Sequence, residues 1–245
     1  MRFQGVANVM RFNWHFYLLA FLVVATVLSI AVVASSPALF VAGFLLAVPA
    51  LGSIVVSYLV YDASKLYKFD WLDRLRIVNT SSVLNIHAGF DETTKPLTER
   101  FPNWSLFVFD FYDETKHTEI SIRRARSSTA SIPSAKVASN DLPLAENSID
   151  LCLLIFAAHE IRSEPERCTL FVELRRSIKS SGRIVVTEHL RDIPNALAYN
   201  IGAHHFFSRS TWLNTFARAD LSLIGEFKIT PFVTAFVLAK NGTAT

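Results

Sequence analysis

The feature that most constrains this chain is a long stretch without charge near its N-terminus. No charged residue occurs between Phe16 and Tyr61, and Ser35-Ser36-Pro37 divides this stretch into two apolar parts. A helix of about 20 apolar residues crosses the hydrocarbon core of a bilayer. The sequence therefore predicts that segment 1–61 contains a transmembrane helical hairpin, with spans over 16–34 and 38–61.

Two other interpretations of this stretch are weaker. A cleaved signal peptide has a shorter apolar region, and here a second apolar run follows the first almost at once. A buried hairpin in a soluble protein needs a much larger core than the about 180 residues after Tyr61 can supply.

Basic residues flank the hairpin at both ends and are absent from its turn. They are Arg2, Arg11, Lys65, Lys68, Arg74 and Arg76. Because basic residues concentrate on the cytoplasmic side, we expect an integral membrane protein with both termini and the following domain in the cytoplasm.

Residues 62–81 are expected to link the hairpin to this domain. Tyr, Phe and Trp alternate with Lys and Arg over residues 61–75, which suits a segment at the level of the lipid headgroups. An amphipathic helix packed on the domain fits the same pattern, and the sequence leaves both open.

Charge and cysteine content exclude several classes of function. The net charge is +3, of which only +1 falls after the hairpin, so no basic surface for nucleic acid is expected. Cys152 and Cys168 lie in a predicted strand and a predicted helix, where reduced, buried thiols are expected.

A strand, a tight turn and a helix start follow one another at residues 82–94. The apolar run reaches Ala88-Gly89, and Asp91 and Glu92 come next. This arrangement is typical of the nucleotide-cofactor corner of an open α/β sheet, although only one glycine is present.

An acid follows the second predicted strand. The apolar run 105–109 ends at Asp110, about 20 residues after the glycine turn, where a carboxylate can accept hydrogen bonds from both ribose hydroxyls. A helix N-cap is the alternative role for Asp110.

The arginine-rich segment 119–136 is expected to be a solvated loop, with a loop over the cofactor or a lipid-contacting strip as alternatives.

The later strands are clearer. The continuous apolar run 148–156 predicts a central parallel strand that is buried on both faces. A helix is expected from Ser163, its N-cap, to Gly182, and the next strand covers 183–187. After a helix capped by Ser208, two antiparallel strands are expected on either side of Thr230-Pro231.

This order of elements resembles the class I S-adenosylmethionine-dependent methyltransferases over roughly residues 82–240. The matching features are the loop 85–91, Asp110, the pair of segments Leu142-Pro143-Leu144 and Ile149-Asp150, the helix end 180–182 and the last two strands. The resemblance implies an α/β Rossmann-like sheet over 82–245, mostly parallel with a final antiparallel strand. Asn85, His87 and Asp91 stand where the family usually has an acid and two glycines.

The acids after the glycine turn favour S-adenosylmethionine over a dinucleotide. Asp91 and Glu92 lie at a helix N-terminus, where their charge repels a pyrophosphate but attracts a positive sulfonium and amine. The resemblance places the cofactor against seven residues, namely Asn85, His87, Ala88, Gly89, Asp110, Asp141 and Leu142.

Titratable residues also end the fourth and fifth predicted strands. His159, Glu160, Glu188 and His189 are the candidate catalytic residues, since a phenol acceptor needs a base near its proton. His204, His205 and Phe206 are candidates for contact with the acceptor. No metal site is expected, and a zinc site from these histidines and acids is the weaker alternative.

The sequence thus predicts a membrane-anchored, S-adenosylmethionine-dependent methyltransferase. A membrane hairpin suits a hydrophobic acceptor that resides among membrane lipids, such as a quinone precursor, an alkylphenol or resorcinol, or a phospholipid. The alternatives are a non-catalytic membrane scaffold with a methyltransferase fold and, more weakly, a nicotinamide-dependent oxidoreductase.

Overall fold

The computed structural model describes residues 3–75, 80–128 and 133–242. The chain divides into two compact units, which we call the hairpin unit (Met1–Ser64 with Arg191–His205) and the sheet unit (Lys65–Leu190 with Phe206–Thr245). The described residues do not include Arg2, Arg76 or 129–132. Parts of the orientation, linker and loop predictions depend on these residues.

Two long apolar helices dominate the hairpin unit. α1 (Gln4–Phe12) leads into α2 (Trp14–Val33), and α3 (Pro37–Tyr58) returns beside α2 and continues as the π-helical turn η1 (Leu59–Ala63). Ser36 caps α3 by accepting a hydrogen bond from the Leu39 amide, so the predicted break is a helix start. By length and composition, both helices qualify as membrane spans.

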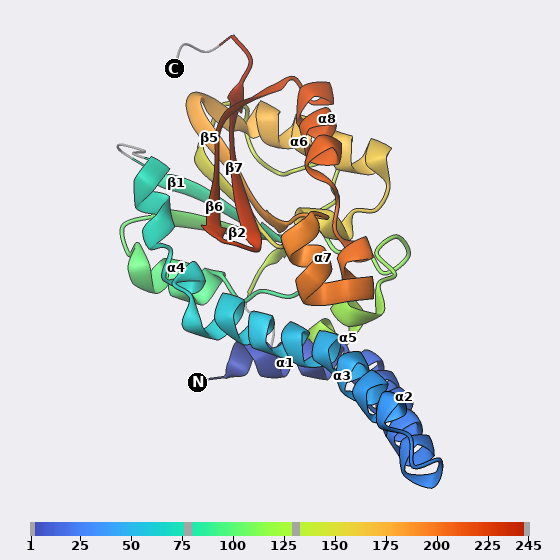
Figure 1. Cartoon of the computed structure of the whole chain (residues 1–245). Helices are drawn as coiled ribbons and strands as arrows, with labels where there is room; N and C mark the ends of the chain where they lie inside the picture. Colours follow the sequence, from blue (N-terminus) through green and yellow to red (C-terminus); the bar gives the residue numbers. More distant parts are fainter. Residues whose placement is uncertain (1–2, 76–79, 129–132, 243–245) are drawn as a thin grey trace. The chain divides into compact units, whose positions relative to one another are not determined.

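A segment from late in the chain also belongs to the hairpin unit. α7 (Ile193–Tyr199) and the 3₁₀-helix η5 (Asn200–His205) cluster with residues 1–64, and α7 packs against α3 (Figure 1). The sequence assigned these residues to the domain 82–245, because they fall between predicted strands and helices of that domain.

The sheet unit contains, among the described residues, a seven-stranded sheet of order β3-β2-β1-β4-β5-β7-β6. The first five strands in this order are mutually parallel, and β7 is antiparallel to both β5 and β6. The strands are β1 (Ser82–His87), β2 (Ser105–Asp110), β3 (Ala135–Lys136), β4 (Ile149–Ile155), β5 (Ile178–His189), β6 (Leu221–Thr230) and β7 (Val233–Lys240). The predicted mostly parallel α/β sheet with a final antiparallel strand is confirmed.

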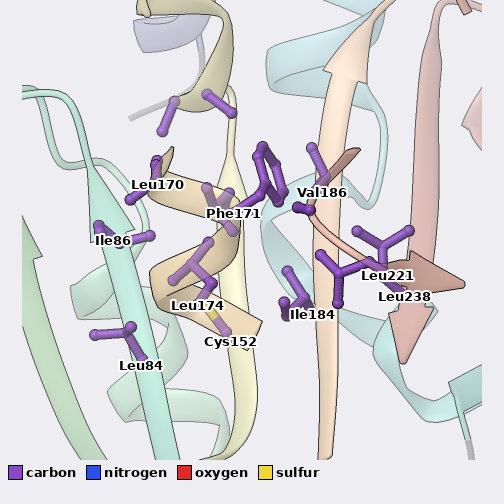
Figure 2. Close-up of a cluster of buried hydrophobic side chains, with 14 of the residues drawn as sticks. Leu84, Ile86, Cys152, Leu170, Phe171, Leu174, Ile184, Val186, Leu221 and Leu238 are labelled. Carbon is purple, nitrogen blue, oxygen red and sulfur yellow. The ribbon is translucent and has the colours of Figure 1, made fainter. Parts of the chain in front are cut away.

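One face of the sheet packs against α6 (Glu164–Ser177) and α8 (Arg209–Arg218). Figure 2 shows Leu170, Phe171 and Leu174 of α6 among side chains of β1, β4 and β5. Trp212 and Phe216 of α8 belong to the same buried cluster. The other helices of this unit are α4 (Thr94–Arg100), α5 (Ile120–Ser128) and the 3₁₀-helix η4 (Ala158–Glu160).

The aromatic segment after the hairpin contributes to a second core cluster. It forms the 3₁₀-helices η2 (Leu66–Lys68) and η3 (Asp70–Leu75), and Phe69, Trp71 and Leu72 are buried with side chains of β1 and β4. The Trp71 indole donates to the Leu66 carbonyl oxygen at 2.9 Å. Of the two interpretations left open, the structure therefore supports packing on the sheet for residues 66–75.

The prediction that Gly182 ends a helix is wrong. α6 ends at Ser177, and β5 begins at Ile178 and includes Gly182. The pairing of β4 with β5 shifts between Ile149 and Leu151, so residues between Ile178 and Arg183 form a bulge. A Cβ on Gly182 would lie 2.9 Å from the Ile149 carbonyl oxygen, which explains the glycine by close backbone approach.

Candidate active site at the carboxyl edge of the sheet

The turn after β1 is built around Gly89. Gly89 has φ of +84°, a conformation that other residues rarely adopt. Its amide donates to His87 Nδ1 at 3.0 Å, which leaves the proton of the neutral imidazole on Nε2. Burial lowers the pKa of His87 despite the nearby carboxylates of Asp91 and Asp110, so the ring is uncharged at neutral pH. Nε2 is buried and has no hydrogen-bond partner among the described residues.

The helix start beyond this turn is held by side chains. Asp91 Oδ1 accepts hydrogen bonds from the backbone amides of Thr93 and Thr94, each at 2.9 Å. The Asn85 side-chain amide donates to the Thr93 and Thr94 hydroxyls at 2.9 and 2.8 Å, which connects β1 to the start of α4. Asn85 therefore has a structural role at the position where the family usually has an acid.

Asp110 ends β2 directly beside this turn. It is the register partner of His87, and its side chain is almost completely buried. Oδ1 accepts from the Tyr112 amide at 3.0 Å, and Oδ2 lies 2.9 Å from Lys136 Nζ. Burial acts to raise the pKa of Asp110, but the hydrogen bonds from Lys136 and Tyr112 outweigh it and hold the pKa below its usual range. Asp110 is therefore a carboxylate at neutral pH.

Arg126 of α5 occupies the space above the glycine turn. Its Nη1 lies 3.1 Å from Asp110 Oδ2, and its guanidinium stacks over the Tyr112 ring at 4.2 Å from the centroid. A methyl group on Gly89 would collide with this guanidinium. The sequence drew attention to the arginine-rich segment but predicted a solvated loop, because the partner of Arg126 is 16 residues earlier in the chain.

A histidine between two carboxylates lies where β4 and β5 end. His159 Nδ1 is 2.7 Å from Glu188 Oε2, and its Nε2 is 3.3 Å from Glu160 Oε1. The His159 backbone amide also donates to Glu188 Oε1 at 3.2 Å. The structure thus brings together three of the four residues that the sequence proposed as catalytic.

These carboxylates set the charge of the cluster. Burial acts to lower the pKa of His159, but Glu188 and Glu160 outweigh it and raise the pKa to about 10. His159 is therefore an imidazolium at neutral pH. It holds a proton that it can donate or share.

The fourth candidate, His189, is enclosed by aromatic rings. Its imidazole stacks between Phe156 and Phe206, with centroid distances of 5.1 and 4.9 Å. Nδ1 lies 2.9 Å from the Phe232 carbonyl oxygen, which can only accept, so Nδ1 carries a proton. Phe156 was not among the predicted site residues, since its apolar run predicted only a buried strand.

The remaining predicted site residues belong to both units of the chain. Leu142 is buried and its amide donates to Glu173 Oε2 at 3.2 Å, whereas Asp141 is exposed. His204 and His205 end η5 in the hairpin unit, and Phe206 begins the last part of the sheet unit.

Comparison with known proteins adds the fold family. No protein-family model matches this sequence, and no curated protein matches it significantly. Solved structures do match. A SAM-dependent methyltransferase from Aquifex aeolicus has 15% identity and a TM-score of 0.52, over 72% of this chain and 93% of that chain. This chain has the fold of the class I S-adenosylmethionine-dependent methyltransferases.

Two further structures agree on this fold. The riboflavin-derivative dimethyltransferase RosA from Streptomyces davawensis has 12% identity and a TM-score of 0.53, over 91% of this chain and 70% of that chain. An S-adenosylmethionine-dependent methyltransferase from Clostridium acetobutylicum has 10% identity and a TM-score of 0.50, over 72% of this chain and 91% of that chain.

The corner at Gly89 fits the cofactor of this fold after two basic side chains move. The atoms nearest to a Cβ on Gly89 belong to the flexible Arg126 side chain, and Asp110 supplies a buried carboxylate beside it. The long side chains of Arg126 and Lys136, which both pair with Asp110, can change rotamer without moving the backbone. The residues present are therefore compatible with S-adenosylmethionine when Arg126 and Lys136 withdraw from Asp110.

Proposed function

We propose that this chain is a membrane-anchored, S-adenosylmethionine-dependent methyltransferase that acts on a lipid-like or aromatic acceptor. The observation that carries the proposal is the buried Asp110 carboxylate beside the Gly89 turn, in a sheet with the methyltransferase strand order. This is the edge at which open α/β sheets bind ligands.

The cofactor, when bound, supplies a methyl group on a positively charged sulfur. Asp110 is suited to accept hydrogen bonds from ribose hydroxyls, and the His87 Nε2 proton is available as a donor. Asp91 adds negative charge at the start of α4, which favours a cationic ligand over a phosphate. Asn85, Ala88, Gly89, Asp141 and Leu142 complete the proposed cofactor contacts.

Glu160 is the proposed base for the acceptor. His159 already carries a proton, and the Glu188 side chain is almost inaccessible and engaged with His159. Glu160, whose side chain is 7% exposed against 1% for Glu188, is the remaining carboxylate, and the His159 ring 3.3 Å from its Oε1 orients it. A phenolic hydroxyl that loses its proton to Glu160 becomes the stronger nucleophile that methyl transfer needs.

The acceptor class follows from the hairpin. α2 and α3 are long and apolar enough to anchor the protein in a bilayer, and their apolar side chains are largely exposed. Such an anchor favours a quinone precursor, an alkylphenol or resorcinol, or a phospholipid over a water-soluble acceptor. The flanking basic residues favour a cytoplasmic catalytic unit, and His204, His205 and Phe206 are proposed to contact the acceptor.

Two measurements test this proposal. Calorimetric titration of the detergent-purified chain with S-adenosylmethionine should give saturable binding. Mass spectrometry of lipid extracts from cells with and without the gene should show a lipid pair that differs by one methylene. Failure to bind the cofactor at millimolar concentration contradicts the proposal.

A non-catalytic scaffold is the second candidate function. The ion pairs of Arg126 and Lys136 with Asp110 favour it, because they occupy the acid that a cofactor needs. A scaffold requires neither Asp110 nor Glu160 for its cellular role. Complementation by variants at these two positions therefore separates the two candidates.

A further inference from the structure

We infer that the segment Arg191–His205, inserted between β5 and α8, is a third membrane-contacting element that lies in the lipid leaflet beside α3. This inference rests on the proposed membrane insertion of α2 and α3. It goes further by assigning a lipid contact to residues outside the two long apolar helices.

The first observation is an exposed apolar stripe. Ile193, Leu197 and Ile201 are 76%, 75% and 79% exposed, although each is large and aliphatic. Ile193 and Leu197, four residues apart, lie on one face of α7, and Ile201 follows in η5. No charged residue occurs over 193–203, so no charge interrupts this apolar face.

The second observation is how this segment joins the hairpin. The opposite side of α7 carries the buried residues Asn195 and Ala198, and α7 packs against α3 (Figure 1). The Asn200 side-chain amide donates to the Pro49 carbonyl oxygen of α3 at 3.3 Å. A small residue such as Ala198 allows two helices to approach closely.

The level of this contact along α3 points to lipid as the occupant. Pro49 precedes the last residue of α3, Tyr58, by nine positions, which is about 13 Å along a helix. A helix of 22 residues is about as long as the hydrocarbon core is thick, so Pro49 lies within the apolar layer when α3 spans it. An element beside Pro49 therefore meets acyl chains or the headgroup boundary, and not bulk water.

The polar groups of the segment fit this location. Asp192 caps α7 by accepting from the Asn195 amide at 3.1 Å and from its side chain at 2.8 Å. Backbone and amide groups near the apolar layer need such partners. The exposed Val48 and Leu51 on α3 flank Pro49, so the apolar stripe continues a surface that already faces lipid in the proposed orientation.

Lipid-quenching of single-cysteine probes, in the full chain with Cys152 and Cys168 replaced by alanine, tests this inference. The full chain with L197C is labelled with an environment-sensitive fluorophore and reconstituted into phosphatidylcholine vesicles that carry nitroxide on the acyl chain. Because an interfacial helix buries its apolar face about 5–10 Å deep, we expect at least about threefold stronger quenching at this site than at S181C. Ser181 is exposed on β5 of the sheet unit and serves as the aqueous control.

L45C separates the failure of this inference from the failure of membrane anchoring. Leu45 is an exposed residue of α3. If L45C is quenched and L197C is not, the segment does not contact lipid and the inference is overturned, while the anchor stands. If neither is quenched, both proposals fail. Shielding of L197C from lipid nitroxide and from aqueous iodide together would indicate a protein partner and also overturn the inference. I193C, on the same stripe, repeats the test where labelling at Leu197 impairs folding.

Discussion

Arg126 Nη1 lies 3.1 Å from Asp110 Oδ2, so the acid that ends β2 already holds a cation beside the Gly89 turn. The ion pair is largely shielded, with Asp110 6% and Arg126 23% exposed at the side chain. In the proposed binding mode S-adenosylmethionine breaks this pair, so Arg126 competes with the ribose hydroxyls for Asp110.

Replacing Arg126 should therefore tighten cofactor binding. A hydrogen bond to a charged group contributes about 1.5–3 kcal/mol, so R126A should lower the Kd for S-adenosylmethionine by about tenfold or more. Isothermal titration calorimetry measures this change. R123A, an exposed arginine on the same helix, is the matched control and should leave the Kd unchanged. Equal affinities for R126A and the unaltered chain would contradict the competition.

Asp110 should be essential for cofactor binding. D110N keeps the shape but removes the charge that strengthens two hydrogen bonds, so we expect a loss of affinity of about 100-fold. Titration of the variant measures this loss. A D110N variant that supports normal growth in complementation would favour the scaffold.

Glu160 should control turnover and not cofactor binding. If it is the base, E160Q should lower kcat by about 10²–10⁴-fold while the Kd for S-adenosylmethionine stays the same. Single-turnover kinetics with the identified acceptor measures the chemical step. E99Q, an exposed glutamate at the far end of α4, is the control. An unchanged rate for E160Q would exclude Glu160 as the base.

His159 should make stability depend on pH on the alkaline side. Its folded pKa of about 10 lies above the ordinary value of 6.5, so its contribution to stability is complete below pH 6.5 and is lost as the pH rises to about 10. H159Q leaves two carboxylates facing each other without a cation, which should cost about 3–5 kcal/mol at neutral pH. Thermal unfolding between neutral and alkaline pH measures both effects, and H204Q, at an exposed histidine, should behave as the unaltered chain.

Trp71 should stabilise the sheet unit. It is 5% exposed and packs among residues of the second core cluster, so W71A should lower the free energy of unfolding by about 3–5 kcal/mol. W14A, at a tryptophan that is 52% exposed in the hairpin unit, is the control for the loss of an indole. Thermal unfolding in detergent measures both. Equal losses of stability for W71A and W14A would favour the headgroup interpretation of residues 66–75 over packing on the sheet.

Local patterns in the sequence were sufficient for most of the elements. The uncharged runs predicted α2 and α3, and the continuous apolar run 148–156 predicted β4. Ser163 and Ser208 cap α6 and α8 as their spacing indicated. These signals are readable because each depends on residues within one or two turns of each other, where hydrophobic period and capping preferences act directly.

The pairing of distant charges could not be read in this way. Arg126 and Asp110 are 16 residues apart, and His159 and Glu188 are 29 apart. Parallel strands bring their carboxyl ends to one edge, so the sequence could place His159, Glu160 and Glu188 at a common rim. It could not show that His159 lies between both acids, because that depends on η4 turning the chain back toward β5.

The sequence by itself therefore determined an apolar hairpin, an α/β sheet and the acid beside a glycine turn. The tertiary structure alone decided that Arg126 occupies that acid, that His159 carries a proton, and that residues 191–205 pack with the hairpin unit. The physical reason is the range of the interactions. Periodicity and capping act between near neighbours in the chain, whereas burial and ion pairing depend on which distant segments the fold brings into contact.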